Sequence, residues 1–316
     1  MIRLILLVIF TCICFDAYPF WIWSPKTQKW KNPEYSALAT PTLQYKEAIK
    51  YFKKGEFKRA YKEFKKLLVN YPDSKEGPEA QYYLGRTLEE LDKPYEAYLA
   101  FKKVIQSYPN SKRINEIVER EYNIGEYFLN RENKKLLGIS IYDFVNHPSV
   151  QIFQSIVEET PYSEYASRAQ YKLGVIFLQL SRFKEAREAF QKVIDDYPDS
   201  RWATPAKYQL ALATAQAFPG ADYDASYLKK ATQRLDEFIK EHPEAKISKK
   251  AKGQLAKLRS KEAKKVFEIA LFYKKQKKPQ SAKIYLEKII NKYPDTPYYQ
   301  KAKQVLKELG GLSKSK

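Results

Sequence analysis

A four-residue phrase recurs along this chain and carries the same turn chemistry each time. Its clear copies are Tyr71-Pro72-Asp73-Ser74, Tyr108-Pro109-Asn110-Ser111, Tyr197-Pro198-Asp199-Ser200 and Tyr293-Pro294-Asp295-Thr296, with looser copies at Pro161 and Pro243. Proline ends a helix because it has no amide hydrogen to donate, and the Asp, Asn or Ser beside it can cap the helix that follows. A helix-ending phrase that recurs at a regular spacing predicts an array of helical repeats.

Residues at fixed distances before these prolines also share their character. Each proline is preceded, at the same offsets every time, by two small residues and then by a Phe or Leu. The four clearest triplets are Ala48, Ala60 and Phe64; Gly85, Ala97 and Phe101; Gly174, Ala186 and Phe190; and Ala270, Ala282 and Leu286. Small residues let two helices approach closely, and the larger residue fills the space between them. This is the tetratricopeptide pattern, a helix pair of about 34 residues.

Two more copies fit once insertions are allowed. The third runs from Gly125 to Pro161 and holds extra residues at 134–147, and the fifth runs from Leu210 to Pro243 with a loop at 219–222. A sixth copy opens with a long helix, 248–276, and a single helix, 298–309, is expected to cover the end of the stack. We therefore predict an all-α fold, a right-handed tetratricopeptide solenoid of five to six helix pairs with a C-terminal capping helix. It spans 42–309 and precedes a flexible basic tail, 310–316.

Positive charge collects at one end of the chain. The net charge is +20, and residues 246–316 hold 21 Lys and Arg against five Asp and Glu. Such a surface is either a solvated lysine face or a docking surface for an acidic partner or anionic lipid. Nucleic acid is not expected, because Arg259 is the only arginine in that segment and no nucleic-acid module accompanies it.

The N-terminus has the features of an export signal. Met1-Ile2-Arg3 starts it with a positive charge, and the apolar run at 4–14 is too short to cross a bilayer but fits a signal-peptide core. Residues 1–17 are therefore the predicted leader, cut after Ala17 or carrying a lipid on Cys12 or Cys14 as in bacterial lipoproteins. Both cysteines of the chain lie here, so we expect no disulfide in the folded part.

Three of the four tryptophans fall within the predicted strap at 18–41, where Pro25 and Pro33 interrupt the chain. The favoured interpretation is an extended strap whose aromatic side chains pack on the first helix pair. A membrane-interface contact and a partner-binding peptide are the alternatives.

No catalytic or metal-binding pattern is present. His147 and His242 each precede a proline and neither has the spacing of a metal ligand. The sequence contains no glycine-rich phosphate loop, no nucleophile elbow and no zinc pair. We expect no enzymatic activity and no cofactor.

Three details together resemble the BamD-like outer-membrane assembly lipoproteins. They are the Tyr-Pro-Asp-Ser phrase at repeat ends, the enlarged third repeat between Gly125 and His147-Pro148, and the late long helix that leads to Tyr293-Pro294-Asp295-Thr296-Pro297. The resemblance covers most of residues 42–309.

This resemblance implies a non-enzymatic adaptor in the periplasm, at the outer membrane of a Gram-negative-type bacterium. Its partners would be a BamA-like barrel protein with periplasmic domains and unfolded outer-membrane proteins. The groove of the first three repeats would take an extended peptide, with Tyr45, Tyr82, Tyr83 and Arg86 as candidate lining residues. The basic end would dock an acidic partner surface through Lys261, Lys264, Lys265, Lys274 and Lys275.

Two other functions stay open. One is a periplasmic coordinator of envelope or cell-division machinery of the Tol–Pal type, although residues 18–41 lack the heptads of a coiled coil that would favour it. The other is a module that binds anionic lipid or polymer through the cationic end, with an affinity that falls as salt is added.

Overall fold

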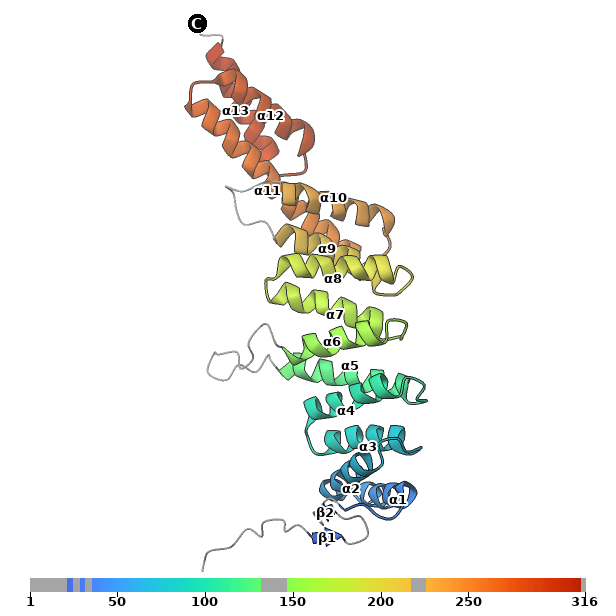
Figure 1. Ribbon diagram of the computed structural model, residues 1–316. Coiled ribbons are helices and arrows are strands. Elements are labelled where there is room, and N and C mark those ends of the chain that lie inside the picture. Colours follow the sequence, from blue (N-terminus) through green and yellow to red (C-terminus); the bar gives the residue numbers. More distant parts are fainter. Residues whose placement is uncertain (1–21, 25–28, 32–35, 132–146, 217–225, 314–316) are drawn as a thin grey trace, which may run out of the picture. The chain divides into compact units, whose positions relative to one another are not determined.

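The computed structural model describes residues 22–24, 29–31, 36–131, 147–216 and 226–313 (Figure 1). Within these segments a short hairpin, β1 (Ile22–Ser24) and β2 (Lys29–Lys31), precedes thirteen helices. The helices are α1 (Pro41–Lys53), α2 (Phe57–Asn70), α3 (Gly77–Glu90), α4 (Pro94–Ser107), α5 (Ile114–Arg131), α6 (Pro148–Glu159), α7 (Ala166–Gln179), α8 (Phe183–Asp196), α9 (Ala203–Gln216), α10 (Ser226–Glu241), α11 (Ser248–Lys275), α12 (Pro279–Lys292) and α13 (Tyr298–Ser313). Helices that follow one another in a repeat pack together, as α1 does on α2 and α7 on α8. The predicted all-α tetratricopeptide fold is confirmed.

The chain forms two compact units, residues 1–124 and residues 125–316. In unit 1 the first core gathers Ala48, Ala60, Phe64, Leu67 and Ala80. In unit 2 one core forms around α9 and α10, and another forms around α12.

The small residues of the repeat are close-contact positions. A Cβ atom built on Gly174 would lie 2.5 Å from Cε1 of Phe190, and one built on Gly125 would lie 2.7 Å from Cε1 of Phe153. Ordinary van der Waals contact begins near 3.4 Å. Glycine is therefore needed where the fully buried Phe190 ring closes on α7.

Each clear repeat turns between its two helices through a left-handed residue. Gly55, Asp92, Ser181 and Lys277 have φ values of 75°, 56°, 57° and 55°. All four lie at the same offset from the proline of their repeat. Only Gly55 adopts this conformation without a steric cost.

The Tyr-Pro turns end helices as predicted, but their Asp and Ser residues act differently from the prediction. The N–H of Tyr71 still reaches the carbonyl of Leu67 at 2.8 Å and so ends α2. The helices α3 and α7 begin at N-cap residues, Glu76 and Tyr165, that make no side-chain cap. Ser111 accepts a hydrogen bond from the N–H of Arg113 at 3.2 Å, which stabilises the turn ahead of α5. The expectation that these residues cap the next helix is therefore wrong for α3 and α7.

A buried glutamine joins the two helices of three repeats. Gln44, Gln81 and Gln170 occupy the same position relative to their prolines and are at most 4% exposed. Their Nε2 atoms donate to the backbone carbonyls of Glu63, Ala100 and Ala189 at 3.1, 3.0 and 3.0 Å. A buried amide has to find a partner, and this one finds it across the helix pair. The sequence analysis did not single out this position.

The long helix α11 serves two cores. Ala251 and Leu258 in its first half belong to the core around α10, whereas Val266 and Ala270 in its second half belong to the core around α12. The predicted helix at 248–276 is confirmed to within one residue. The last helix is longer than predicted, because α13 continues through Gly310 and Gly311 to Ser313.

Several expectations lie outside the described residues or touch their edge. The leader, Cys12, Cys14, residues 134–146 of the predicted insertion and the loop at 219–222 are not described. His147, which follows the insertion, is buried and caps α6, since its Nδ1 accepts from the N–H of Ser149 at 3.0 Å. No helix in the described part of the chain is both long and apolar enough to span a membrane.

Candidate functional site

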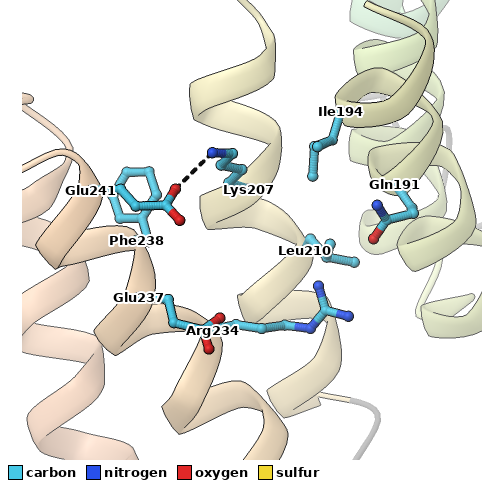
Figure 2. A pocket seen from close by; sticks show the side chains of 8 residues that line it. All are labelled: Gln191, Ile194, Lys207, Leu210, Arg234, Glu237, Phe238 and Glu241. Carbon is cyan, nitrogen blue, oxygen red and sulfur yellow. Dashed lines mark hydrogen bonds and ion pairs between the residues drawn. The ribbon is translucent and has the colours of Figure 1, made fainter. Parts of the chain in front are cut away.

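Two hollows occupy equivalent places in successive repeats of unit 2. The first has a volume of about 170 Å³, and Figure 2 shows its lining residues, Gln191, Ile194, Lys207, Leu210, Arg234, Glu237, Phe238 and Glu241. On its rim Lys207 Nζ lies 2.7 Å from Glu241 Oε2. The second, of about 300 Å³, lies between α6, α7 and α8, where Leu173 takes the place of Leu210. Pockets for small molecules usually enclose about 300–1,000 Å³. The first hollow is smaller than this, and the second only reaches the lower end of the range.

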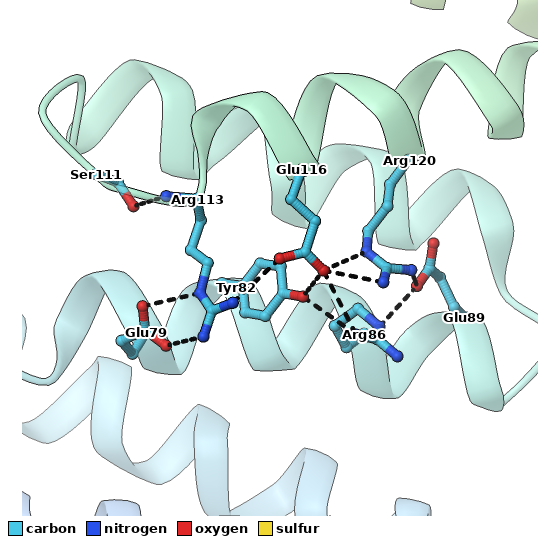
Figure 3. Close-up of polar contacts among 8 residues, drawn as sticks. All are labelled: Glu79, Tyr82, Arg86, Glu89, Ser111, Arg113, Glu116 and Arg120. Carbon is cyan, nitrogen blue, oxygen red and sulfur yellow. Dashed lines mark hydrogen bonds and ion pairs between the residues drawn. The ribbon is translucent and has the colours of Figure 1, made fainter.

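Unit 1 carries a charged network on α3 and on α5 (Figure 3). Arg113 donates from Nε and Nη2 to the two carboxylate oxygens of Glu79, at 3.2 Å each. Its Nη1 also reaches Glu116 Oε2 at 3.1 Å. Glu79 and Arg113 are 34 residues apart, so this contact joins α3 to the start of the next repeat. A two-pronged guanidinium–carboxylate contact fixes the geometry of both side chains.

Tyr82 and Glu116 form the centre of this network. The Tyr82 hydroxyl donates to Glu116 Oε1 and accepts from Arg86 Nη1 at 3.1 Å. Burial raises the pKa of Tyr82, and the hydrogen bond to Glu116 raises it further. Burial also acts to raise the pKa of Glu116, but the hydrogen bonds from Tyr82 and Arg120 outweigh it, and the pKa is lowered. Glu116 is therefore held as a carboxylate.

Arg120 extends the network along the two helices. Its Nη2 lies 3.0 Å from Glu116 Oε1, and its Nη1 lies 2.9 Å from Glu89 Oε2. Burial raises the pKa of Glu89 despite the attraction of Arg120 and Arg86. Besides Tyr82, the network contains three arginines and three glutamates, whose charges balance. They are Arg86, Arg113 and Arg120, and Glu79, Glu89 and Glu116. The network orders the surface of α3 and of the start of α5, and the Tyr82 side chain at its centre is 1% exposed.

The predicted groove residues divide between this network and an aromatic cluster. Tyr45 and Tyr83 are half-buried, and their ring centroids lie 6.4 Å apart. Tyr83 also stacks on Phe64 with centroids 6.0 Å apart and an interplanar angle of 11°. Burial, and then the charge of Glu79, raise the pKa of Tyr45. Both side chains are partly exposed at the surface of unit 1.

Tyr82 is not a lining residue. It is 1% exposed, because its ring packs against Phe101 with centroids 6.0 Å apart. Arg86 is half-buried and engaged by Glu89, whose Oε2 lies 3.2 Å from its Nε. Tyr82 and Tyr83 are neighbours in sequence and lie about 100° apart around the helix, so only one of them can face outward.

The lysines of the predicted basic surface differ in exposure and in ion pairing. On α11, Lys261, Lys264 and Lys275 are exposed, whereas Lys265 is half-buried. Lys264 Nζ lies 3.7 Å from Glu268 Oε1 across one helical turn. Lys274 Nζ lies 2.6 Å from Glu308 Oε2, so this lysine joins α11 to α13 instead of facing a partner.

Two apolar side chains lie among these lysines, and the sequence analysis missed them. Leu271 is 39% exposed and Phe272 is 56% exposed. The places equivalent to Phe272, at the same offset from the repeat proline, are Thr87 in α3 and Ile176 in α7, which are 0% and 3% exposed. Phe272 is exposed because the preceding helix, α10, shares a core with the first half of α11, at Ala251 and Leu258, and not with the half that carries Phe272. The sequence did contain one sign of this exposed side chain, because Phe272 stands at a position that is polar, Thr87, in α3.

Among the described residues no group of His, Cys, Asp and Glu side chains is arranged to hold a metal ion. The candidate site is therefore a set of surfaces. These are the aromatic and charged surface of unit 1 and the exposed face of α11 in unit 2. We call the latter the α11 face and define it by Lys261, Lys264, Leu271, Phe272 and Lys275.

Comparison with known families identifies the kind of protein that bears these surfaces. A family model described as an outer membrane lipoprotein, YfiO, matches residues 146–310, just over half of the chain. The chain belongs to this family. A tetratricopeptide repeat model matches residues 43–74 and 79–111. The chain is thus a BamD-like tetratricopeptide protein, and the predicted resemblance is confirmed.

Solved structures show more distant likenesses. A tetratricopeptide repeat protein from Parabacteroides merdae is 13% identical, with 85% of this chain and 98% of that chain covered and a TM-score of 0.34. The pilF protein of Pseudomonas aeruginosa is 16% identical, with 84% and 96% covered and a TM-score of 0.31. PilW, a type IV pilus biogenesis factor, is 15% identical, with 84% and 99% covered and a TM-score of 0.30. Scores this low carry no argument about this chain. No curated protein matches it.

Proposed function

We propose that this BamD-like chain is a non-enzymatic scaffold of the machinery that inserts β-barrel proteins into the outer membrane. The match of the outer membrane lipoprotein family to residues 146–310 carries the proposal. Both matching families are protein-interaction modules, and a helical repeat stack provides extended surfaces without a reaction centre. The protein would act in the periplasm at the outer membrane, after export by a leader at 1–17 and with Cys12 or Cys14 as the lipid-attachment site.

The α11 face is the proposed docking surface for the periplasmic domains of the central barrel protein. It combines exposed lysines with Leu271 and Phe272, and interface cores favour exposed aromatic residues surrounded by polar ones. The excess of lysine in 246–316 favours an acidic partner surface and speeds the encounter with it. Lys274 is excluded from this surface by its contact with Glu308.

The surface of unit 1 is the proposed site for segments of unfolded barrel proteins. Tyr45 and Tyr83 are half-buried side chains, and Arg86 belongs to the neighbouring network. Because that network is balanced in charge, it would select peptides by aromatic contact and hydrogen bonds more than by net charge. Strands of barrel proteins alternate apolar and polar residues, which suits such a surface.

The test is a native purification of the tagged protein from detergent-solubilised envelopes, with co-purifying chains identified by mass. Recovery of an outer-membrane barrel that bears periplasmic domains is the expected result. Recovery of inner-membrane or wall-synthesis components without that barrel would refute the proposal and favour a coordinator of the Tol–Pal type.

A matched pair of variants maps the docking surface. Lys261→Glu with Lys264→Glu places two acidic residues on the α11 face, and we expect it to lower barrel recovery at least about tenfold, as for a disrupted charged interface. Lys288→Glu with Lys307→Glu makes the same change in charge at exposed positions of α12 and α13, and should leave recovery near that of the parent. Equal losses in the two pairs would show that net charge matters and the α11 face does not.

A further inference from the structure

The hairpin before the first repeat exposes a pair of tryptophans. β1 and β2 run antiparallel, with Trp23 directly opposite Trp30. The two rings meet edge to face, with centroids 5.6 Å apart and an interplanar angle of 65°. Trp23 is still 46% exposed and Trp30 is 61% exposed, although the two rings are in contact.

A ribbon of this size has little stability of its own. Each strand contains three residues, and an isolated two-stranded hairpin is marginal in water even with a good aromatic pair across it. Exposed indoles on so small an element gain most from a surface that covers them. Trp23 and Trp30 therefore have exposed ring surface left for a further contact.

The composition of the hairpin indicates what that surface is. Residues 17–33 contain three tryptophans and three lysines, with no Asp or Glu. Tryptophan is enriched where a bilayer meets water, because its ring is apolar and its N–H needs a polar partner. Lysines next to such rings attract anionic headgroups.

The strap is fastened close behind the hairpin. The N–H of Leu38 donates to Gln44 Oε1 at 2.8 Å, and its carbonyl accepts from the Tyr71 hydroxyl at 2.5 Å. The short span from Lys31 to Leu38 reaches at most about 25 Å, even when fully extended. A membrane that bound the hairpin would therefore hold the first helix pair next to its surface.

We propose that the Trp23–Trp30 hairpin binds the interfacial layer of an anionic phospholipid bilayer. The contact adds a second membrane attachment to whatever lipid the N-terminal cysteines carry. The inference goes beyond the scaffold function and fails separately from it, because it requires no assembly partner.

The experiment uses the protein purified from envelopes and vesicles of phosphatidylethanolamine with phosphatidylglycerol. Trp202→Phe serves as the parent, so that emission comes only from the N-terminal tryptophans. Flotation gives the partition coefficient, and quenching by brominated lipids gives the depth of the indoles. We expect quenching from the shallow brominated positions and binding that weakens as salt is added.

Trp23→Ala with Trp30→Ala should lower the partition coefficient at least about tenfold, since two half-exposed indoles lose their burial in the bilayer. Leu271→Ala with Phe272→Ala is the matched control, because it removes exposed apolar side chains beside lysines on the α11 face. Circular dichroism checks that both variants keep the helical fold.

Three results would overturn the proposal. The first is unchanged partition of the double tryptophan variant, which would leave binding to a lipid anchor alone. The second is a loss confined to the α11 variant, which would make the cationic end the lipid-binding module. The third is absence of quenching in the bound parent, which would leave the hairpin for a protein partner.

Discussion

The close approach of Gly174 to Phe190 gives a sharp test of how these repeats pack. Gly174→Ala places a methyl group 2.5, 2.7 and 2.8 Å from three ring atoms of a phenylalanine that is 0% exposed. The same substitution at Gly253, in the interior of α11, meets no atom within 4 Å. The two changes are chemically identical, so their difference isolates the contact.

The magnitude follows from two opposing effects. Replacing a glycine by alanine in a helix interior stabilises it by about 1 kcal/mol, which is the whole effect expected at Gly253. Forcing one extra methyl group into a packed core costs about 1–3 kcal/mol. We therefore expect the free energies of unfolding of the two variants to differ by about 1–3 kcal/mol, with Gly253→Ala the more stable.

The chain also contains its own rescue. Where the small residue is Ala211 or Ala270, the large residue opposite is Leu235 or Leu286 instead of Phe. Gly174→Ala combined with Phe190→Leu should therefore be more stable than the sum of the single changes predicts, because leucine leaves room for the methyl group. Ala48 faces Phe64 in the first repeat, so a wider helix spacing can accommodate the pair at another site.

Denaturant unfolding followed by circular dichroism, with hydrogen exchange of the α7 amides, measures these effects. Hydrogen exchange is needed because repeat arrays need not unfold in one step. If Gly174→Ala stabilised the protein as much as Gly253→Ala, or if Phe190→Leu gave no rescue, the reasoning about the close contact would be refuted.

Two further predictions concern a turn and a salt bridge. Lys277→Gly should stabilise the protein by about 0.5–1 kcal/mol, because lysine adopts the left-handed conformation of this exposed turn at a steric cost that glycine does not have. Gly55→Ala should destabilise the protein by about 1 kcal/mol for the same reason. Thermal unfolding measures both changes, and equal effects of the two variants would refute the role of backbone conformation. The hydrogen bonds from Arg259, whose Nη2 lies 2.6 Å from Oδ1 of Asp295, are the main cause that lowers the pKa of Asp295. The contribution of this ion pair to the free energy of unfolding is therefore present above the unfolded pKa near 3.8 and is lost as pH falls through the lower folded pKa. Arg259→Gln should flatten the acid side of the stability profile while Lys307→Gln should not, and identical profiles in the two variants would contradict this role.

The roles of two further repeat positions, the buried glutamine and the left-handed turn residue, could not be predicted from the sequence. The left-handed residues keep one offset to the proline in all four clear repeats, as the small residues do, and the buried glutamine keeps its offset in three of them. Their roles depend on which atoms they meet across the helix pair, as when Gln170 Nε2 meets the carbonyl of Ala189 at 3.0 Å. Asp92, Ser181 and Lys277 also differ in type, so nothing in their chemistry signals a shared backbone conformation.

The candidate site was the part least predictable from sequence. Tyr82 and Tyr83 are identical side chains one residue apart, and only the packing of Phe101 decides that Tyr82 is buried. Lys274 and Lys275 are also identical neighbours, and they differ because Lys274 forms an ion pair with Glu308 of α13. Phe272 is exposed where Ile176 is buried because of how α11 is shared between two cores.

The sequence by itself determined that the chain is a helical repeat protein and where most helices begin and end, because proline, small residues and large apolar residues act locally at fixed spacing. Tertiary structure decided that α11 serves two cores and that α13 continues through Gly310 and Gly311, where buried Leu309 packs with Val266 in one core. It also decided which lysines and tyrosines remain available to partners. Those outcomes depend on contacts between residues far apart in the chain, and such contacts leave no periodic signal.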